Sequence, residues 1–317
     1  MRFRDKIKKP QRPVVTYEIL PPREKDGTLN SYAEKISSLL SQTHIDAINI
    51  PEVREEEGRG KRPVVNSSRA EPRHFGRLLQ DMVGVESIVN RVVVHDDLKD
   101  QIKWFRETHE KYEIENMIIV GGESSKIKYI GPTVNQILEL VAFKYNNNGG
   151  DILCGGITLP TRLNESKNLI RKSGNGAEFF TTQVLCDSEN IVKMMNKYQE
   201  RCDALNTFPR RILLSFAPIS SEKNIQFLKW LGVEISKDTE KYLFGRPGSM
   251  TERSLDVAIE VFNKIIDNIN DNNLKIPIGL NVEHIMSYNF QSSVEMLQEL
   301  AKIYRSFCLK SKSINPF

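Results

Sequence analysis

The chain has 317 residues, with 45 Lys and Arg against 41 Asp and Glu, and a formal net charge of +4. Most of the positive excess lies in the first dozen residues, so the composition argues against a nucleic-acid-binding protein with an extended basic surface. No apolar run has the length of a membrane span, and no apolar block follows the basic N-terminus. We therefore expect a cytoplasmic protein without a membrane or nucleic-acid partner.

Residues 1–12 read MRFRDKIKKPQR, and we expect a basic, solvent-exposed N-terminal arm that leads into the first strand. Alternating strand-like and helix-like segments follow to the end of the chain, which predicts parallel βα units. We count about eight units, the number in a (β/α)8 TIM barrel. No linker interrupts them, so residues 1–317 are expected to form a single catalytic barrel domain. The predicted strands are 13–20, 46–50, 87–95, 116–121, 151–158, 178–185, 210–217 and 276–283.

Segments with a 3.6-residue apolar period lie between these strands, for example 32–40 and 134–142, and predict helices that cover the barrel. Residues 251–270 predict an unusually long helix before the last strand, and 290–308 predict another after it. Residues 52–72 are crowded with charge and lack apolar periodicity, so they predict a long loop after the second strand. Such a loop is either a lid over a site or a solvated insertion.

The first predicted strand contains an acid that calls for an explanation. Residues 16–23 read TYEILPPR and place Glu18 within an apolar strand that Pro21 and Pro22 end. Glu18 therefore lies near the carboxyl end of its strand, where barrel enzymes place their chemistry. Burial there disfavours the charged form, so the carboxyl group can keep its proton near neutral pH.

Polar residues at the ends of successive barrel strands face one mouth. They are Glu18, Asn49, His95, Glu123, Thr158, Gln183, Ser215, Glu283 and His284. Taken singly, each is explained by exposure at a strand end, but Glu18, Glu123 and Gln183 are flanked by apolar residues or glycine. No dinucleotide fingerprint, phosphate loop or nucleophile elbow is present. The five histidines are scattered and the four cysteines are widely spaced, so we expect buried thiols and no metal site.

Three motifs, in order, resemble those of methylenetetrahydrofolate reductases. TYEILPPR resembles the family's SFEFFPPR opening, VGGE at 120–123 takes the place of its strand-four RGD, and GAEFFTTQVLCD at 176–187 resembles GAxxxITQxFFD. The resemblance implies an eight-stranded barrel that reduces 5,10-methylenetetrahydrofolate to 5-methyltetrahydrofolate with NADH or NADPH. Such an oxidoreductase serves one-carbon metabolism and methionine biosynthesis.

The resemblance also implies roles for single residues. Glu18 matches the family's general acid, Glu123 matches the aspartate of RGD, and Gln183 matches the glutamine that contacts the pterin. These residue types fit the chemistry, because opening the imidazolidine ring needs a proton on the leaving nitrogen. A carboxylate can accept two N–H donors from the pterin edge at once.

The cofactor implied by the family is FAD, which lies across the barrel mouth. Part of its support is a helix with the pattern acid-x-x-Asn-x-x-Arg-Lys, matched here by Glu165, Asn168, Arg171 and Lys172. Other flavin contacts differ, including those after strands two, three and five and the aromatic sequence of strand eight. These departures resemble the flavin-free branch of the family, in which the nicotinamide delivers hydride directly. Both routes, FAD and direct transfer, are open at this point.

Two other classes of function also fit the sequence. One is a folate-dependent methyltransferase on the same barrel, and the other is a non-catalytic folate-binding or scaffold protein that kept the pterin pocket. The retained Glu18 favours an enzyme over a binder, although a fold by itself licenses no function. A homo-oligomer is compatible with the sequence.

Overall fold

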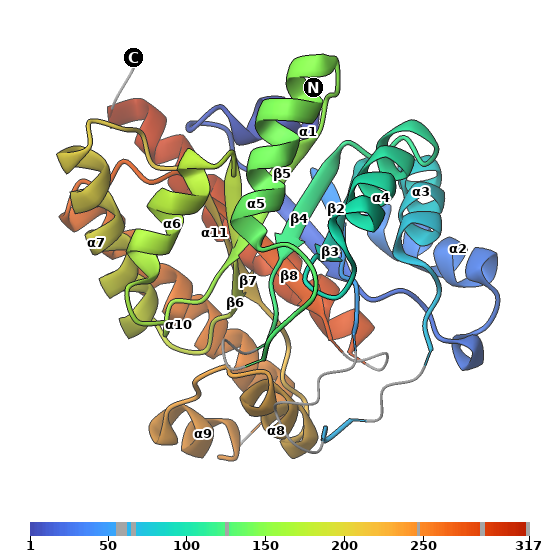
Figure 1. Cartoon of the computed structure of the whole chain (residues 1–317). Helices are drawn as coiled ribbons and strands as arrows, with labels where there is room; N and C mark the ends of the chain where they lie inside the picture. Colours follow the sequence, from blue (N-terminus) through green and yellow to red (C-terminus); the bar gives the residue numbers. More distant parts are fainter. Residues whose placement is uncertain (55–61, 65–67, 124–126, 246–247, 286–288, 315–317) are drawn as a thin grey trace.

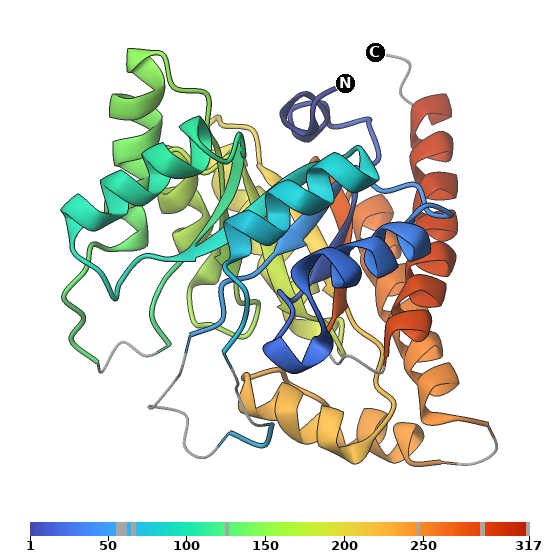
Figure 2. The ribbon, with the colours of Figure 1, turned by 90° about the vertical axis from the view of Figure 1, so that its right-hand side faces the viewer.

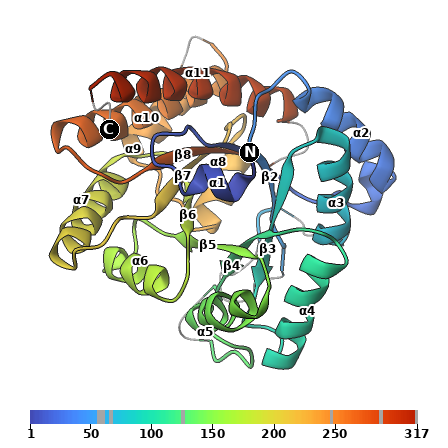
Figure 3. The ribbon, with the colours of Figure 1, turned by 90° about the horizontal axis from the view of Figure 1, so that it is seen from above.

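The computed structural model describes residues 1–54, 62–64, 68–123, 127–245, 248–285 and 289–314. Eight parallel strands close into a barrel in the order β1 to β8, with helices around it (Figures 1 and 3). The predicted (β/α)8 fold and all eight predicted strands are confirmed. The strands are β1 (Val15–Ile19), β2 (Ala47–Ile50), β3 (Glu86–Val92), β4 (Asn116–Val120), β5 (Leu153–Thr158), β6 (Phe179–Val184), β7 (Arg211–Phe216) and β8 (Ile278–His284).

The helices cover the outside of the barrel and both of its ends. The long helices predicted at 251–270 and 290–308 are confirmed as α10 and α11, and segment 134–142 forms α5 with the π-helix η2. The α-helices are α1 (Phe3–Ile7), α2 (Leu29–Leu40), α3 (Pro72–Val83), α4 (Leu98–Glu110), α5 (Val134–Glu139), α6 (Glu165–Gly174), α7 (Glu189–Ala204), α8 (Glu222–Trp230), α9 (Lys237–Leu243), α10 (Met250–Asp271) and α11 (Phe290–Ile314). The 3₁₀-helices are η1 (Glu24–Asp26) and η3 (Asn146–Asn148), and the π-helix is η2 (Leu140–Tyr145).

The N-terminal segment does not form the solvent-exposed arm that its charge predicted. Helix α1 lies across the amino end of the barrel, over its centre in Figure 3. Phe3 and Ile7 are only 1% and 4% exposed and fill the amino end of the barrel, where the Phe3 and Phe179 rings pack edge to face with their centroids 5.8 Å apart. Lys6 pairs with Asp46 at 2.5 Å. The arm prediction was wrong because two apolar residues spaced four apart make an apolar helix face even among basic neighbours.

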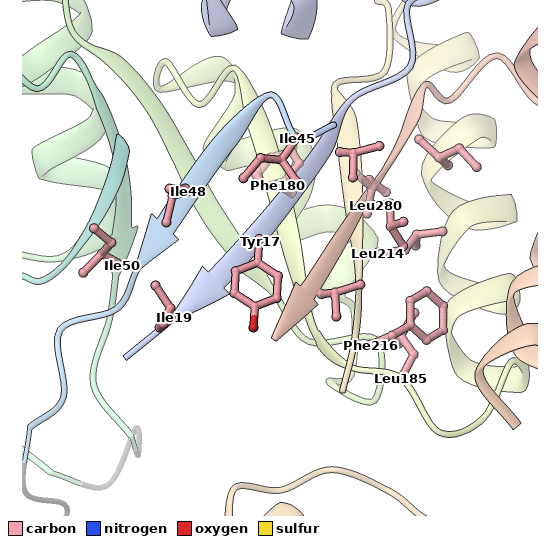
Figure 4. Packing of buried hydrophobic residues seen from close by; sticks show 14 of the residues in the cluster. Tyr17, Ile19, Ile45, Ile48, Ile50, Phe180, Leu185, Leu214, Phe216 and Leu280 are labelled. Carbon is pink, nitrogen blue, oxygen red and sulfur yellow. The ribbon is translucent and has the colours of Figure 1, made fainter. Parts of the chain in front are cut away.

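Alternation along the strands decides which side chains enter the barrel. On β1, Tyr17 and Ile19 point outward into the core between strands and helices (Figure 4), and the Tyr17 hydroxyl lies 2.6 Å from Ser293 Oγ on α11. The residues between them, Thr16 and Glu18, therefore face the barrel interior. Inside the barrel, apolar side chains such as Ile88, Ile118 and Leu213 pack together near Phe3, and a hydrogen-bonded polar layer that includes Thr16 and Asn281 lies nearer the carboxyl end.

The connection between β7 and α10 is long and carries two additional helices. Helices α8 and α9 lie beyond the carboxyl ends of the strands, at the bottom of the view in Figure 1. Helix α8 begins after Ser221, whose side chain accepts a hydrogen bond from the Asn224 backbone N–H and caps the helix. Of the two helices, α8 lies directly at the barrel mouth.

Candidate functional site

A cavity of about 240 Å³, which we call the mouth cavity, lies at the carboxyl end of the barrel. Its walls come from the strand ends, from the segment after β2 and from α8. The described residues that line it are Glu18, Leu20, Pro51, Glu52, Val53, Arg54, Arg62, Val92, His95, Val120, Gly121, Glu123, Phe227, Trp230, Leu231, Glu283, His284 and Ile285. Two of the predicted site residues, Glu18 and Glu123, are thus brought together.

Glu18 is half-buried in the cavity wall. Its Oε2 accepts hydrogen bonds from the Asn49 amide and, at 3.4 Å, from Asn281 Nδ2. Burial raises the pKa of Glu18 to about 7, because the two amide hydrogen bonds only partly offset the loss of water around the charged form. A carboxyl group in this setting can give or take a proton near neutral pH.

A second carboxyl group lies beside Glu18. Glu283 on β8 is the register partner of Glu18 on β1, and both line the cavity. Burial, with the nearby Glu18 charge, raises the pKa of Glu283 well above its usual range. The sequence places Glu283 at a strand end but does not reveal this pairing, because the contact between the first and last strands forms only when the barrel closes.

Below the carboxyl pair, hydrogen-bonded polar side chains fill the barrel interior. Thr16 Oγ1 donates to Asn281 Oδ1 at 2.8 Å, and Asn281 Nδ2 donates to Ser215 Oγ at 3.0 Å. The Ser215 hydroxyl also lies 3.3 Å from Thr181 Oγ1. These bonds fix the Asn281 amide so that its N–H groups face Glu18 and Ser215.

Glu123 lies on the opposite side of the mouth, after β4. Its backbone N–H donates to the Tyr129 hydroxyl oxygen at 3.1 Å, which anchors the chain at this point. Of the two preceding glycines, Gly121 lines the cavity, as expected for a close approach of ligand. A Cβ on Gly122 would lie 2.2 Å from the Tyr129 ring, so the second glycine makes room for this tyrosine.

Gln183 is not among the described residues that line the cavity. Its Nε2 donates to the Leu231 carbonyl oxygen at 2.5 Å and so ties β6 to the end of α8. Leu231 itself lines the cavity, so Gln183 supports the wall from behind. The structure does not bring Gln183 together with Glu18 and Glu123, and its contact with a pterin stays a prediction.

The four residues matched to flavin support are bound mainly to one another on α6. Lys172 Nζ donates to the Ile157 carbonyl at 2.6 Å and lies 3.7 Å from Glu165, with side chains 10% and 1% exposed. Asn168 Nδ2 donates to Glu165 at 2.8 Å, and Arg171 donates to Asn168 at 3.1 Å. The quartet does not fit a flavin diphosphate, because its buried ammonium is already neutralised within the protein.

An ion network occupies the rim between β2 and β3. Arg91 donates to Glu52 at 2.9 Å and to Asp96 at 2.6 Å, and Arg54 donates to the same two carboxylates. Glu52 also accepts the Val92 backbone N–H at 2.7 Å. These hydrogen bonds and ion pairs stabilise the rim. The two arginines and the two carboxylates on this side of the mouth are therefore paired with one another.

Residues 62–64, which follow β2 in the sequence, lie beside α8 (Figure 2). The Arg62 guanidinium lies 5.3 Å from the Phe227 ring centroid and 5.1 Å from that of Trp230, within cation–π distance. The two rings are stacked with an interplanar angle of 13°. Glu52 to Arg54 and Arg62 line the cavity, as expected of a lid. Residues 55–61 and 65–67 of the predicted loop lie outside the described residues.

The remaining strand-end candidates divide between the cavity and the outer core. His95 and His284 line the cavity, and the His284 ring packs 4.8 Å from that of Phe290. Thr158 points outward and lies 3.3 Å from the Met194 sulfur. Within the described ranges we find no group of three or more His, Cys, Asp and Glu side chains placed to hold a metal ion.

All four cysteines fall in the described part of the chain and are thiols; Cys154, Cys186 and Cys202 are buried as expected, whereas Cys308 is half-buried. Among the helices that the structure describes, none combines the length and apolar character needed to cross a membrane.

No family model and no curated protein matches the sequence. Among solved structures, the chain is similar to an uncharacterised protein from Clostridium thermocellum that binds two copies of 5-methyl-5,6,7,8-tetrahydrofolic acid. The identity is 19%, the TM-score is 0.76, and the match covers 95% of this chain and 99% of that one. A thermostable aldo-keto reductase in complex with epalrestat (12% identity, TM-score 0.47, coverage 93% and 95%) and 2,3-dimethylmalate lyase (13%, 0.43, 96% and 95%) are more distant.

Proposed function

We propose that this chain binds a reduced folate in the mouth cavity and exchanges a proton with it through Glu18. The observation that carries the proposal is Glu18 itself, an acid in a cavity wall with its pKa raised to about 7. The Clostridium thermocellum protein, which binds a methylated tetrahydrofolate on a similar barrel, supports the choice of ligand. The three sequence motifs support it independently.

In the proposed complex the pterin lies between the two walls of the cavity. Glu123 accepts N–H groups from the pyrimidine edge, because a carboxylate can take two parallel donors. The Phe227 and Trp230 rings offer an apolar aromatic surface on the α8 side. This placement leaves the reduced ring of the folate on the side of Glu18.

The reaction that fits such a proton donor is reduction of 5,10-methylenetetrahydrofolate with NADH or NADPH. Glu18 gives its proton to N10 as the bond between N10 and the bridging carbon breaks, and the electron pair of that bond stays on N10. The carbon, left as an iminium on N5, accepts hydride and becomes the methyl group. Because the α6 quartet does not fit a flavin, we propose that the nicotinamide delivers hydride directly.

Non-catalytic folate binding is the second candidate, and the size of the cavity favours it. About 240 Å³ is below the roughly 300 to 1,000 Å³ of pockets that hold drug-sized ligands. A single pterin fits this volume better than a pterin and a nicotinamide together. A folate-binding protein that has lost the hydride path would keep the same contacts.

Two measurements test the proposal in order. Trp230 lines the cavity and the other tryptophan, Trp104, lies against Arg91 and Arg73. Added 5-methyltetrahydrofolate should therefore change the fluorescence of the wild type but not that of Trp230→Phe. Oxidation of NADH or NADPH that depends on 5,10-methylenetetrahydrofolate would then establish the reductase. Binding without turnover would select the non-catalytic candidate, and no binding would exclude both.

A further inference from the structure

The pairing of β1 with β8 brings two acids together in the wall of the mouth cavity. Glu18 and Glu283 are register partners, so their backbones are separated by about one strand spacing, roughly 4.8 Å. Both side chains line the same cavity. The two carboxyl groups therefore lie close enough for the charge of one to affect the ionisation of the other.

The polar partners of this pair are uncharged. Amide groups of Asn49 and Asn281 donate to Glu18, and the Ser215 hydroxyl hydrogen-bonds to Glu283. In the described ranges of the chain, no Lys, Arg or His side chain lies within ion-pair distance of either acid. Nothing there offsets the charge of two carboxylates.

Other charged and titratable groups face the pair from the rest of the cavity wall, but each has contacts of its own. Glu52 and Arg54 belong to the rim ion network, Arg62 lies over two aromatic rings, and His95 and His284 pack against Tyr129 and Phe290. The full set is Glu52, Arg54, Arg62, His95, Glu123 and His284. Among the described residues, none of these groups is an ion-pair partner of Glu18 or Glu283.

The described neighbours of Glu18 and Glu283 include no cation, and two such carboxylates repel each other. The second carboxyl group therefore ionises with more difficulty than the first, and the two titration steps belong to the pair. We propose that Glu283 acts through Glu18 by sharing one proton with it, so that the pair still holds an acid at neutral pH. Glu283 is then a positioning residue for proton transfer. This positioning role rests on the proposed function, whereas the shared proton does not.

The proton balance of the proposed step is simple. The proton leaves Glu18 for the folate nitrogen, whose bond to the bridging carbon breaks with its electron pair retained on nitrogen. The pair of acids changes from one negative charge to two. Repulsion between the two carboxylates then favours the return of one proton from water after the product leaves.

Infrared titration of the folate-free protein tests the shared proton. The wild type should hold one protonated carboxyl at pH 7 that is lost at higher pH. In Glu283→Gln the Glu18 signal should disappear at a pH lower by about one unit or more, and Glu18→Gln should shift Glu283 in the same direction. Glu260→Gln, on the exposed face of α10 and paired with Lys264, should shift neither.

Identical titration of Glu18 in the wild type and in Glu283→Gln would overturn the proposal. If Glu283→Gln fails to fold, ¹³C NMR of glutamate-labelled wild type decides instead: two coupled steps support a shared proton, and two independent steps reject it. These titrations use protein without folate. If the Glu18 pKa falls in Glu283→Gln but the wild type does not bind folate, the shared proton stands and only the proposed function is rejected.

Discussion

The guanidinium carbon of Arg62 lies 5.1 Å from the centre of the Trp230 ring, which joins the segment after β2 to α8 at the barrel mouth. Three cavity-lining side chains, those of Arg62, Phe227 and Trp230, meet at this point. The contact therefore holds Arg62 against α8 at the edge of the cavity.

Arg62→Ala should weaken folate binding by about threefold to tenfold, because a partly desolvated cation–π contact contributes on the order of 1 kcal/mol. Fluorescence titration of Trp230 measures the change. Arg73→Ala is the matched control, since Arg73 lies over Trp104 at 5.0 Å and away from the cavity. Equal weakening by both substitutions would mean that Arg62 contributes only general stability.

Glu18→Gln should keep the fold and folate binding but lose most of the turnover. The amide keeps the shape of the side chain and cannot supply a proton of suitable acidity, so the expected loss is on the order of a hundredfold to ten-thousandfold. Steady-state rates with 5,10-methylenetetrahydrofolate measure it, with the exposed Glu295→Gln on α11 as the control. Nearly full turnover in Glu18→Gln would remove Glu18 from the mechanism.

Glu18 should also make the stability of the fold depend on pH. Its pKa is raised from about 4.5 to about 7 in the folded protein. Its contribution is therefore fully present below pH 4.5 and is lost as the pH rises through 7. From pH 5 to pH 8 the wild type should lose on the order of 1 to 3 kcal/mol of unfolding free energy relative to Glu18→Gln. Urea unfolding at both pH values measures this difference, and parallel pH profiles would contradict it.

Lys172→Met should destabilise the protein by on the order of 1 to 3 kcal/mol, because it leaves the buried Glu165 carboxylate with only the half-exposed Arg162 guanidinium, 3.5 Å away, as a counter-charge. The double variant Glu165→Gln with Lys172→Met should recover much of that loss. Urea unfolding measures both values. If Lys172 instead held a flavin, the purified wild type would absorb in the flavin region and the single variant would lose that colour.

The sequence was sufficient to predict the strands and the long helices, because runs of Val and Ile and a 3.6-residue apolar period are local signals. The position of Glu18 followed from the same reasoning. Helix α1 was missed because only two apolar residues, Phe3 and Ile7, mark its buried face, and the barrel end that they fill is formed by residues far along the chain. A local pattern also cannot show whether a lysine is exposed or buried, and Lys172 is buried.

Two features of the site depend on closure of the barrel. Glu283 lies beside Glu18 only because the last strand, β8, pairs with the first strand, β1, when the barrel closes. Gln183 turns toward Leu231 because α8 lies close to the end of β6, which no motif around Gln183 encodes. Long-range pairing of this kind is what a single sequence does not reveal.

Calorimetric titration of 5-methyltetrahydrofolate into the wild type and into Glu123→Ala decides whether Glu123 holds a folate in the mouth cavity. We predict saturable binding to the wild type. In the variant, loss of the charge-assisted contact should weaken binding by on the order of 1.5 to 3 kcal/mol, roughly tenfold to a hundredfold. Absence of binding to the wild type, or equal dissociation constants for the two proteins, would contradict a folate held by Glu123 in the mouth cavity.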